Sequence, residues 1–319
     1  MSVQDIPRPD LPRTRWLRRW FHARGWKALV LGVPSLWLAL LFLAPFAIVL
    51  AISLGQAAPA SPPFRFLPQA PFTDLQSYRR LLGDGMVVQA FLTSVANAAL
   101  TTLICLLVGY PVALGIARAR PRRRSLLLVL IILPFWTSFL LRVYAWMGLL
   151  GGSSWFNKLL TGLFNLFLPA DRALFSLHLM NTNFAVVLVM VYSYLPFMIL
   201  PLFATLEKLD LTLNEAAMDL GSRPFRVFRD VTLPLSLPGI LAGATLVFIP
   251  ACGELVIPSL VGNSYQPMIG RVISDQFSVA RDWPMAAAIS VVLLAVLLGL
   301  MGLLSLLNRR ILRAEGEDA

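Results

Sequence analysis

Two ionisable side chains, Arg142 and Glu254, lie inside long segments that are otherwise apolar. A charge at bilayer depth costs about 2.5–3.5 kcal/mol on insertion scales, so it needs a partner, an aqueous cavity or a function. Pro250 and Pro258 flank Glu254 and each removes a backbone donor, which predicts a broken helix at this point. We interpret Glu254 as a candidate acceptor on a cation pathway. For Arg142 we favour a structural role, either an ion pair with Glu254 or snorkelling toward the outer headgroups.

Four more side chains are candidates for the same pathway. Asp275 and Asp282, between the fifth and sixth apolar runs, could receive a cation before Glu254 does. Tyr144 and Trp146 could contribute cation–π contacts, although interfacial anchoring and core packing explain such residues more often. Both interpretations of the aromatic residues stay open at this point.

Neither a metal site nor an enzyme active site is predicted. Cys105 and Cys252 lie in apolar runs, and His178 has no Cys, His or carboxylate at ligand spacing. An intramembrane enzyme would need a nucleophile with a base, or a metal cluster, and these scattered residues supply neither. The chain has no Gly-x-x-x-x-Gly-Lys-Ser/Thr motif, so we do not expect it to bind ATP through a phosphate-binding loop.

The composition is that of a helical membrane protein. Of 319 residues, 58% are hydrophobic and 13% are charged, which is more apolar surface than one soluble core buries. The first apolar run is too long for a cleavable signal, so we expect a retained helix. Since a crossing needs about 20 apolar residues, we predict an all-α transmembrane protein of about six helices: Ala28–Leu54, Met86–Ala117, Ser125–Leu150, Thr182–Leu206, Leu235–Ile257 and Pro284–Leu307. A short interfacial helix is predicted over Trp155–Leu168.

The basic residues predict the orientation of these helices. The net charge of +11 comes from short clusters between apolar runs, which argues against nucleic acid as a partner. Most of the 27 lysines and arginines fall on one side of the predicted membrane, in residues 1–27, 118–124, 207–234 and 308–319. The positive-inside rule makes this side cytoplasmic, with both termini on it. We therefore expect a basic N-terminal segment (1–27), a transmembrane domain (28–308) and a cytoplasmic tail (309–319).

The cytoplasmic segment 207–234 is patterned as two short helices. Thr212 and Glu215 form a capping box, which predicts the start of the first helix, and Gly221 can take the left-handed conformation that ends it. Pro224 suits the first turn of a second helix, which we expect to end at an aromatic residue, Phe228.

The second predicted helix has a basic face and an aromatic face. Basic residues recur every three positions: Arg223, Arg226 and Arg229. Phe225 and Phe228 occupy another face. From physics alone, such a helix either rests on anionic lipid headgroups or docks against another protein.

The spacing of small and acidic residues in this segment decides between lipid contact and protein docking. Glu215-Ala216-Ala217, then Gly221, then Leu233-Pro234 resemble the EAA motif of permeases from ATP-binding-cassette (ABC) importers. The one departure is Val231, where the family pattern has isoleucine. In that family this loop couples the permease to its ATPase. By resemblance we expect the ATPase-coupling contact to involve Glu215, Ala216, Ala217, Asp219, Gly221, Arg223, Pro224, Arg226 and Pro234.

The resemblance extends over Leu31–Asn308 and narrows to the polyamine permeases, most of all the putrescine type. It is carried by four segments: LPFWTSFLLRVYAWMGLL from Leu133, VYSYLPFMILPL from Val191, FIPACGELVIPSLVG from Phe248, and IGRVISDQF from Ile269 followed by RDWP. It implies a type I ABC importer permease in the bacterial inner membrane that moves putrescine or spermidine inward by alternating access. The implied partners are a second permease, a dimer of ABC ATPases and a periplasmic polyamine-binding protein. ATP and Mg would be held by the ATPase, with no cofactor in this chain.

A different class of transporter is the main alternative. A stand-alone secondary transporter of a small cationic solute would need its own coupling-ion sites and usually shows duplicated halves. The sequence shows no internal repeat, which favours the ABC permease.

Overall fold

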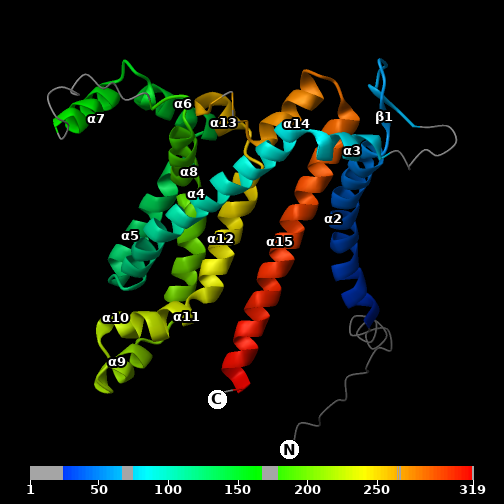
Figure 1. Cartoon of the computed structure of the whole chain (residues 1–319). Helices are drawn as coiled ribbons and strands as arrows, with labels where there is room; N and C mark the ends of the chain where they lie inside the picture. The colour runs from blue at the N-terminus through cyan, green and yellow to red at the C-terminus, as the bar shows by residue number, and fades with distance from the viewer. Residues whose placement is uncertain (1–23, 67–74, 167–178, 264, 266, 318–319) are drawn as a thin grey trace, which may run out of the picture.

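The computed structural model describes residues 24–66, 75–166, 179–263, 265 and 267–317, and these form a bundle of helices with one short hairpin (Figure 1). The predicted segment 1–27 lies almost wholly outside the described residues. The helices are α2 (Arg24–Ser53), α3 (Gln76–Gly83), α4 (Gly85–Ala117), α5 (Pro121–Ile132), η1 (Leu133–Trp136), α6 (Phe139–Leu150), α7 (Trp155–Leu166), α8 (Asn183–Leu206), α9 (Leu211–Asp219), α10 (Pro224–Val227), η3 (Phe228–Thr232), α11 (Leu233–Leu235), α12 (Leu237–Cys252), α13 (Val256–Val261), α14 (Ile269–Ser278) and α15 (Trp283–Glu317). Strands β1 (Gln56–Ala57) and β2 (Phe64–Arg65) pair antiparallel, with Gln56 opposite Arg65.

Long apolar helices account for most of the predicted spans. Within the described residues, parts of α2, α4, α8 and α15 are each long and apolar enough to cross a membrane. Two bent helix pairs also qualify, which gives up to six spans if each pair is one crossing. The prediction of about six transmembrane helices is consistent with this range.

The third predicted span, Ser125–Leu150, is wrong as a single straight helix. It is divided into α5, η1 and α6, and the two halves are bent by 88°. The cause lies in the local sequence, because Pro134 cannot donate to the preceding turn and Thr137 is extended, at φ −89° and ψ 151°. By contrast, Pro111 interrupts nothing, since α4 continues through it to Ala117.

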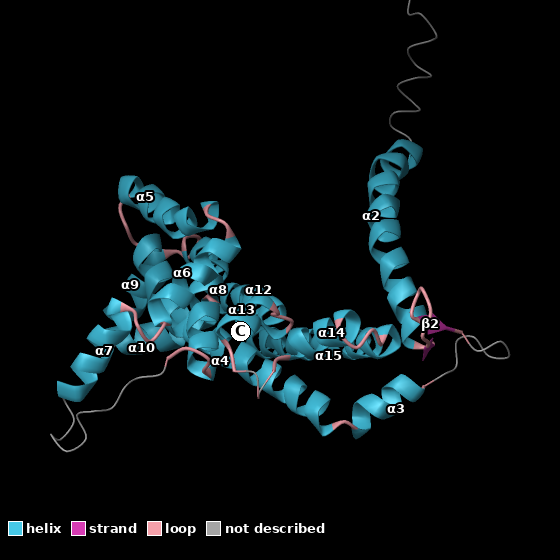
Figure 2. Ribbon diagram, turned by 90° about the horizontal axis from the view of Figure 1, so that it is seen from above, coloured by secondary structure: helices cyan, strands magenta, loops and turns pink. Residues whose placement is uncertain are grey.

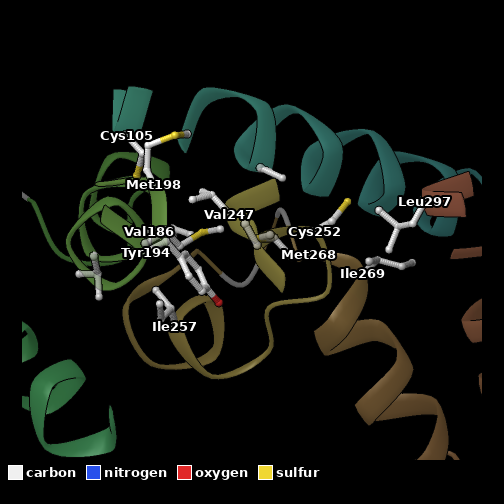
Figure 3. Packing of buried hydrophobic residues seen from close by; sticks show 14 of the residues in the cluster. Cys105, Val186, Tyr194, Met198, Val247, Cys252, Ile257, Met268, Ile269 and Leu297 are labelled. Carbon is white, nitrogen blue, oxygen red and sulfur yellow. The ribbon is translucent and has the colours of Figure 1, made fainter. Parts of the chain in front are cut away.

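The core of the bundle is formed by α4, α8 and α12, which pack closely on one another. Small residues permit this approach: a Cβ at Gly243 of α12 would lie 2.7 Å from Met198 Sδ, and one at Gly109 of α4 would lie 3.2 Å from Met198 Cγ. Figure 3 shows Met198 among the buried side chains of this core. The amides of Asn97 and Asn183 also bond each other reciprocally, at 2.7 and 2.9 Å, between α4 and α8.

Helix α2 stands apart from this core. It packs against α15, and none of its most apolar stretch is buried. Figure 2 shows α2 well away from α4, α8 and α12. Most apolar side chains of α2 are therefore left uncovered by the rest of the described chain.

Candidate coupling loop and translocation segment

The first helix of the candidate coupling loop is capped by an aspartate that the sequence analysis did not select. Asp210 Oδ1 accepts a hydrogen bond from Thr212 N at 3.0 Å. This bond holds the pKa of the Asp210 carboxyl below its usual value. The predicted capping box of Thr212 and Glu215 is wrong, because α9 already begins at Leu211 and Thr212 lies inside it. The sequence signal that could have identified this N-cap is an aspartate directly before the first helical residue.

Gly221 ends α9 as predicted. Its φ is +85°, in the left-handed region. Gly221 N donates to Met218 O at 2.9 Å and Ser222 N donates to Ala217 O at 3.1 Å, which is the bond pair of a Schellman motif. This turn sets the direction in which the chain enters the second helix.

The second helix begins at Pro224 as predicted, but it does not end at Phe228. It continues through the π-helical turn η3 and α11 to Leu235. Helix α4 holds this stretch, because the Tyr110 and Phe228 rings meet edge-on at 5.5 Å and the Tyr110 and Ser236 hydroxyls bond at 2.9 Å. These tertiary contacts carry the helix past the end that the local sequence predicts.

The surface of the loop combines charge with exposed apolar side chains. Figure 1 shows α9 and α10 protruding at the end of the bundle where α2 begins and α15 ends. Leu220 and Phe225 are 88% and 77% exposed. Most of the predicted coupling residues are also exposed: Glu215, Ala216, Asp219, Gly221, Arg223, Pro224 and Arg226. Ala217 and Pro234 are half-buried. Apolar side chains gathered on a polar surface are typical of a protein-docking site.

Glu254 lies in a broken helix, as predicted. Helix α12 ends at Cys252 and α13 begins at Val256, although the break falls between Pro250 and Pro258 rather than at either proline. The Glu254 side chain is buried. Its Oε1 accepts from Val256 N at 3.0 Å and Ile257 N at 3.4 Å, and its Oε2 accepts from the Tyr194 hydroxyl.

Arg142 is not paired with Glu254, so of the two structural roles predicted for Arg142 the ion pair is wrong. Its guanidinium lies over the rings of Phe135, at 4.6 Å, and Phe139, at 5.7 Å. Arg142 Nε is buried without a hydrogen-bond partner among the described residues. Phe139 precedes Arg142 by three residues on α6, whereas Phe135 lies across the bend between η1 and α6, so a single straight helix does not predict the Phe135 contact.

The other candidate pathway residues do not gather around Glu254. Asp282 bonds Arg80 Nη1 at 3.0 Å and accepts from the first turn of α15, while Asp275 is 3.8 Å from Arg271. On α6, Tyr144 is 52% exposed and Trp146 meets the Tyr192 ring edge-on at 5.5 Å. A cavity of about 380 Å³ does adjoin the break, lined by Gly253, Leu255, Gly270, Phe277 and Trp283 with neighbours on α2, α14 and α15.

The fold is a bundle of apolar helices, up to six of them candidate membrane spans, with the exposed helices α9 and α10 at one end. Residues 106–313 match the family described as "Binding-protein-dependent transport system inner membrane component", and the chain belongs to this family. It is a multi-pass inner membrane permease of the ABC importer class. Two solved structures share the fold at TM-scores of 0.67 and 16% identity: a bacterial ABC transporter for alginate import, and an alginate ABC transporter with its pentasaccharide-bound periplasmic protein. The first alignment covers 92% of this chain and 99% of that chain.

Among curated relatives, the chain is similar to permeases of polyamine transport systems. The spermidine/putrescine transport system permease protein PotB of Haemophilus influenzae is 38% identical over 82% of this chain and 88% of its own length. PotB of Escherichia coli K12 is 39% identical over 76% of this chain and 85% of its own length. The E. coli inner membrane ABC transporter permease protein YdcU is 34% identical over 63% of this chain and 66% of its own length. All three are permeases, which are transport subunits rather than enzymes.

Proposed function

We propose that this permease imports a polyamine, putrescine or spermidine, from the periplasm to the cytoplasm by alternating access. Similarity to two PotB permeases over most of both chains supports this substrate class. The partners in the proposal are a second permease, a dimer of ABC ATPases that binds ATP and Mg, and a periplasmic polyamine-binding protein. Both termini and the loop 207–234 lie in the cytoplasm in this arrangement.

The observation that carries the coupling role is the exposed surface of α9 and α10. An ATPase cleft can receive Leu220 and Phe225, and Glu215 and Arg226 are exposed charges on the same two helices. The Schellman turn at Gly221 fixes the angle between the two helices. An ATPase movement applied here passes directly into α8 and α12, which flank the loop.

For the substrate route, we propose the broken segment between α12 and α13 together with the adjoining cavity. Irregular backbone at membrane depth exposes carbonyl oxygens that can replace water around an ammonium group. Asp282 is paired with Arg80 and Asp275 lies 3.8 Å from Arg271, so a cation that binds at either aspartate competes with an arginine. The aromatic rings of Tyr144 and Trp146 are further candidate contacts.

The proposal is tested by uptake in a bacterial strain that lacks its own polyamine importers. The permease is co-expressed with its second permease, ATPase and binding protein, and uptake of labelled putrescine and spermidine is measured. Import that depends on the ATPase and on the binding protein is expected, with an anionic oligosaccharide as a negative control. Uptake by this chain alone that a protonophore abolishes would instead identify the secondary transporter.

A further inference from the structure

Both carboxylate oxygens of Glu254 are occupied by protein donors. Oε1 accepts from the two backbone amides at the start of α13, and Oε2 accepts from Tyr194 on α8. The side chain is only 8% exposed. Figure 3 shows Tyr194 extending from α8 toward the chain that carries Ile257. A carboxylate in this environment caps a helix N-terminus, where negative charge is favoured.

The far end of α13 is also joined to α8. Val261 O accepts from Asn181 N at 3.1 Å, directly before the start of α8. A Cβ at Gly262 would lie 3.0 Å from Val186 Cγ2, so the chain passes close to α8 again. The short helix is thus held to α8 at both of its ends, by a backbone bond at one and by Glu254 at the other.

Helix α8 leads from this contact to the coupling loop. It ends at Leu206, and α9 begins at Leu211. The same helix therefore touches α13 in its outer half and enters the ATPase-docking surface at its inner end. Figure 1 shows α13 and α9 at opposite ends of α8.

We propose that Glu254 is a positioning residue that holds α13 on α8 through Tyr194, so that movement of α8 at the coupling loop carries α13 with it. This inference rests on the proposed transport function and replaces the expectation that the carboxylate itself receives the cation. Each oxygen already accepts from a protein donor, and Glu254 is 8% exposed, so little of the carboxylate is open to a substrate ammonium group. What the segment requires is an acceptor for two amides and one hydroxyl.

The test compares Tyr194→Phe, Glu254→Gln and Glu254→Ala in the complete complex in proteoliposomes, with uptake and ATP hydrolysis measured on the same vesicles. Tyr194→Phe should lower uptake per ATP by about tenfold, the change equivalent to losing one hydrogen bond to a charged group. Glu254→Ala removes all three bonds to the carboxylate and should lower it at least as much. Glu254→Gln should stay within about threefold, because its amide oxygen still accepts from Val256 and Ile257 and its NH₂ can donate to Tyr194.

Tyr192→Phe is the matched control, since the Tyr192 hydroxyl has no hydrogen bond among the described residues and should be dispensable. A pathway role predicts the opposite order: Glu254→Gln as defective as Glu254→Ala, with Tyr194→Phe near wild type. That order would overturn the proposal. Tyr194→Phe removes one oxygen only, so it remains informative if Glu254→Ala fails to fold.

A second measurement does not depend on the substrate. In hydrogen–deuterium exchange of the assembled complex, the peptide 253–262 should exchange about tenfold faster in Tyr194→Phe than in the wild type. In Tyr192→Phe its exchange rate should be unchanged. Unchanged exchange in Tyr194→Phe would contradict the positioning role even if the transported solute proves not to be a polyamine. Failure of wild-type vesicles to take up any polyamine, with the exchange result as expected, would refute only the substrate assignment.

Discussion

At the scale of single residues, Gly221 has the clearest conformational requirement. A β-branched residue at its φ of +85° costs about 1–2 kcal/mol, and it turns the second helix of the loop away from α9. Gly221→Val should therefore insert normally but lose ATPase co-purification and transport. Gly221→Asn, which tolerates the left-handed region, should keep both. Full ATPase binding by Gly221→Val would remove this turn from the coupling mechanism.

Asp210 provides a second test at this scale. Its pKa is lowered by the Thr212 amide, so the stabilisation of α9 is complete above the ordinary aspartate pKa and is lost only as pH falls through the lower folded value. The cap therefore persists throughout the neutral range. Asp210→Ala should speed hydrogen exchange at the start of α9, whereas Asp210→Asn should preserve protection. If Thr212→Ala had the larger effect, the predicted capping box would be reinstated.

Single-residue features that depend on neighbouring residues in the sequence could be predicted. Features that depend on contacts between distant residues could not. The left-handed turn at Gly221 and the break around Glu254 depend on local sequence, and both are present. The Tyr194–Glu254 bond joins residues 60 positions apart, and no local pattern indicates it. The predicted Arg142–Glu254 pair was wrong because an isolated charge suggests a need for compensation without identifying the compensating group.

At the scale of helices, close contact between α8 and α12 makes Gly243 sensitive to any side chain. A Cβ there would also lie 3.1 Å from Met198 O, and the backbone cannot rotate away. Gly243→Val should destabilise the permease by about 1–3 kcal/mol through overpacking, seen as a lower melting temperature in detergent. Gly115→Val is the control, because nothing lies within 4 Å of a Cβ at that exposed position. Equal melting temperatures for the two variants would contradict this packing.

Helix positions were predictable where apolar length decides them and less so where a bend intervenes. The prediction Thr182–Leu206 matches α8 almost residue for residue, with Thr182 as its N-cap. The 88° bend before α6 depends on Pro134 and on an extended Thr137, within a run whose apolar character is continuous. Hydropathy gives the same result for a straight and a bent span.

At the scale of the whole molecule, the positive-inside rule predicts an orientation that can be measured. The C-terminal end of α15, the start of α2 and the loop helices α9 and α10 lie at the same end of the bundle (Figure 1). A fluorescent protein fused after Ala319 should therefore fluoresce, and alkaline phosphatase at the same point should be inactive. Active phosphatase there would reverse the assigned sides.

We propose that this chain is the permease of an ATP-driven polyamine importer and that it is coupled to the ATPase through α9 and α10. The most direct measurement is uptake of labelled spermidine and putrescine into proteoliposomes that contain both permeases and the ATPase, with the binding protein on the substrate side. We expect uptake that requires ATP on the coupling-loop side and that Gly221→Val abolishes while Gly221→Asn preserves. Polyamine uptake that persists without ATP, or that Gly221→Val leaves unchanged, would contradict this coupling.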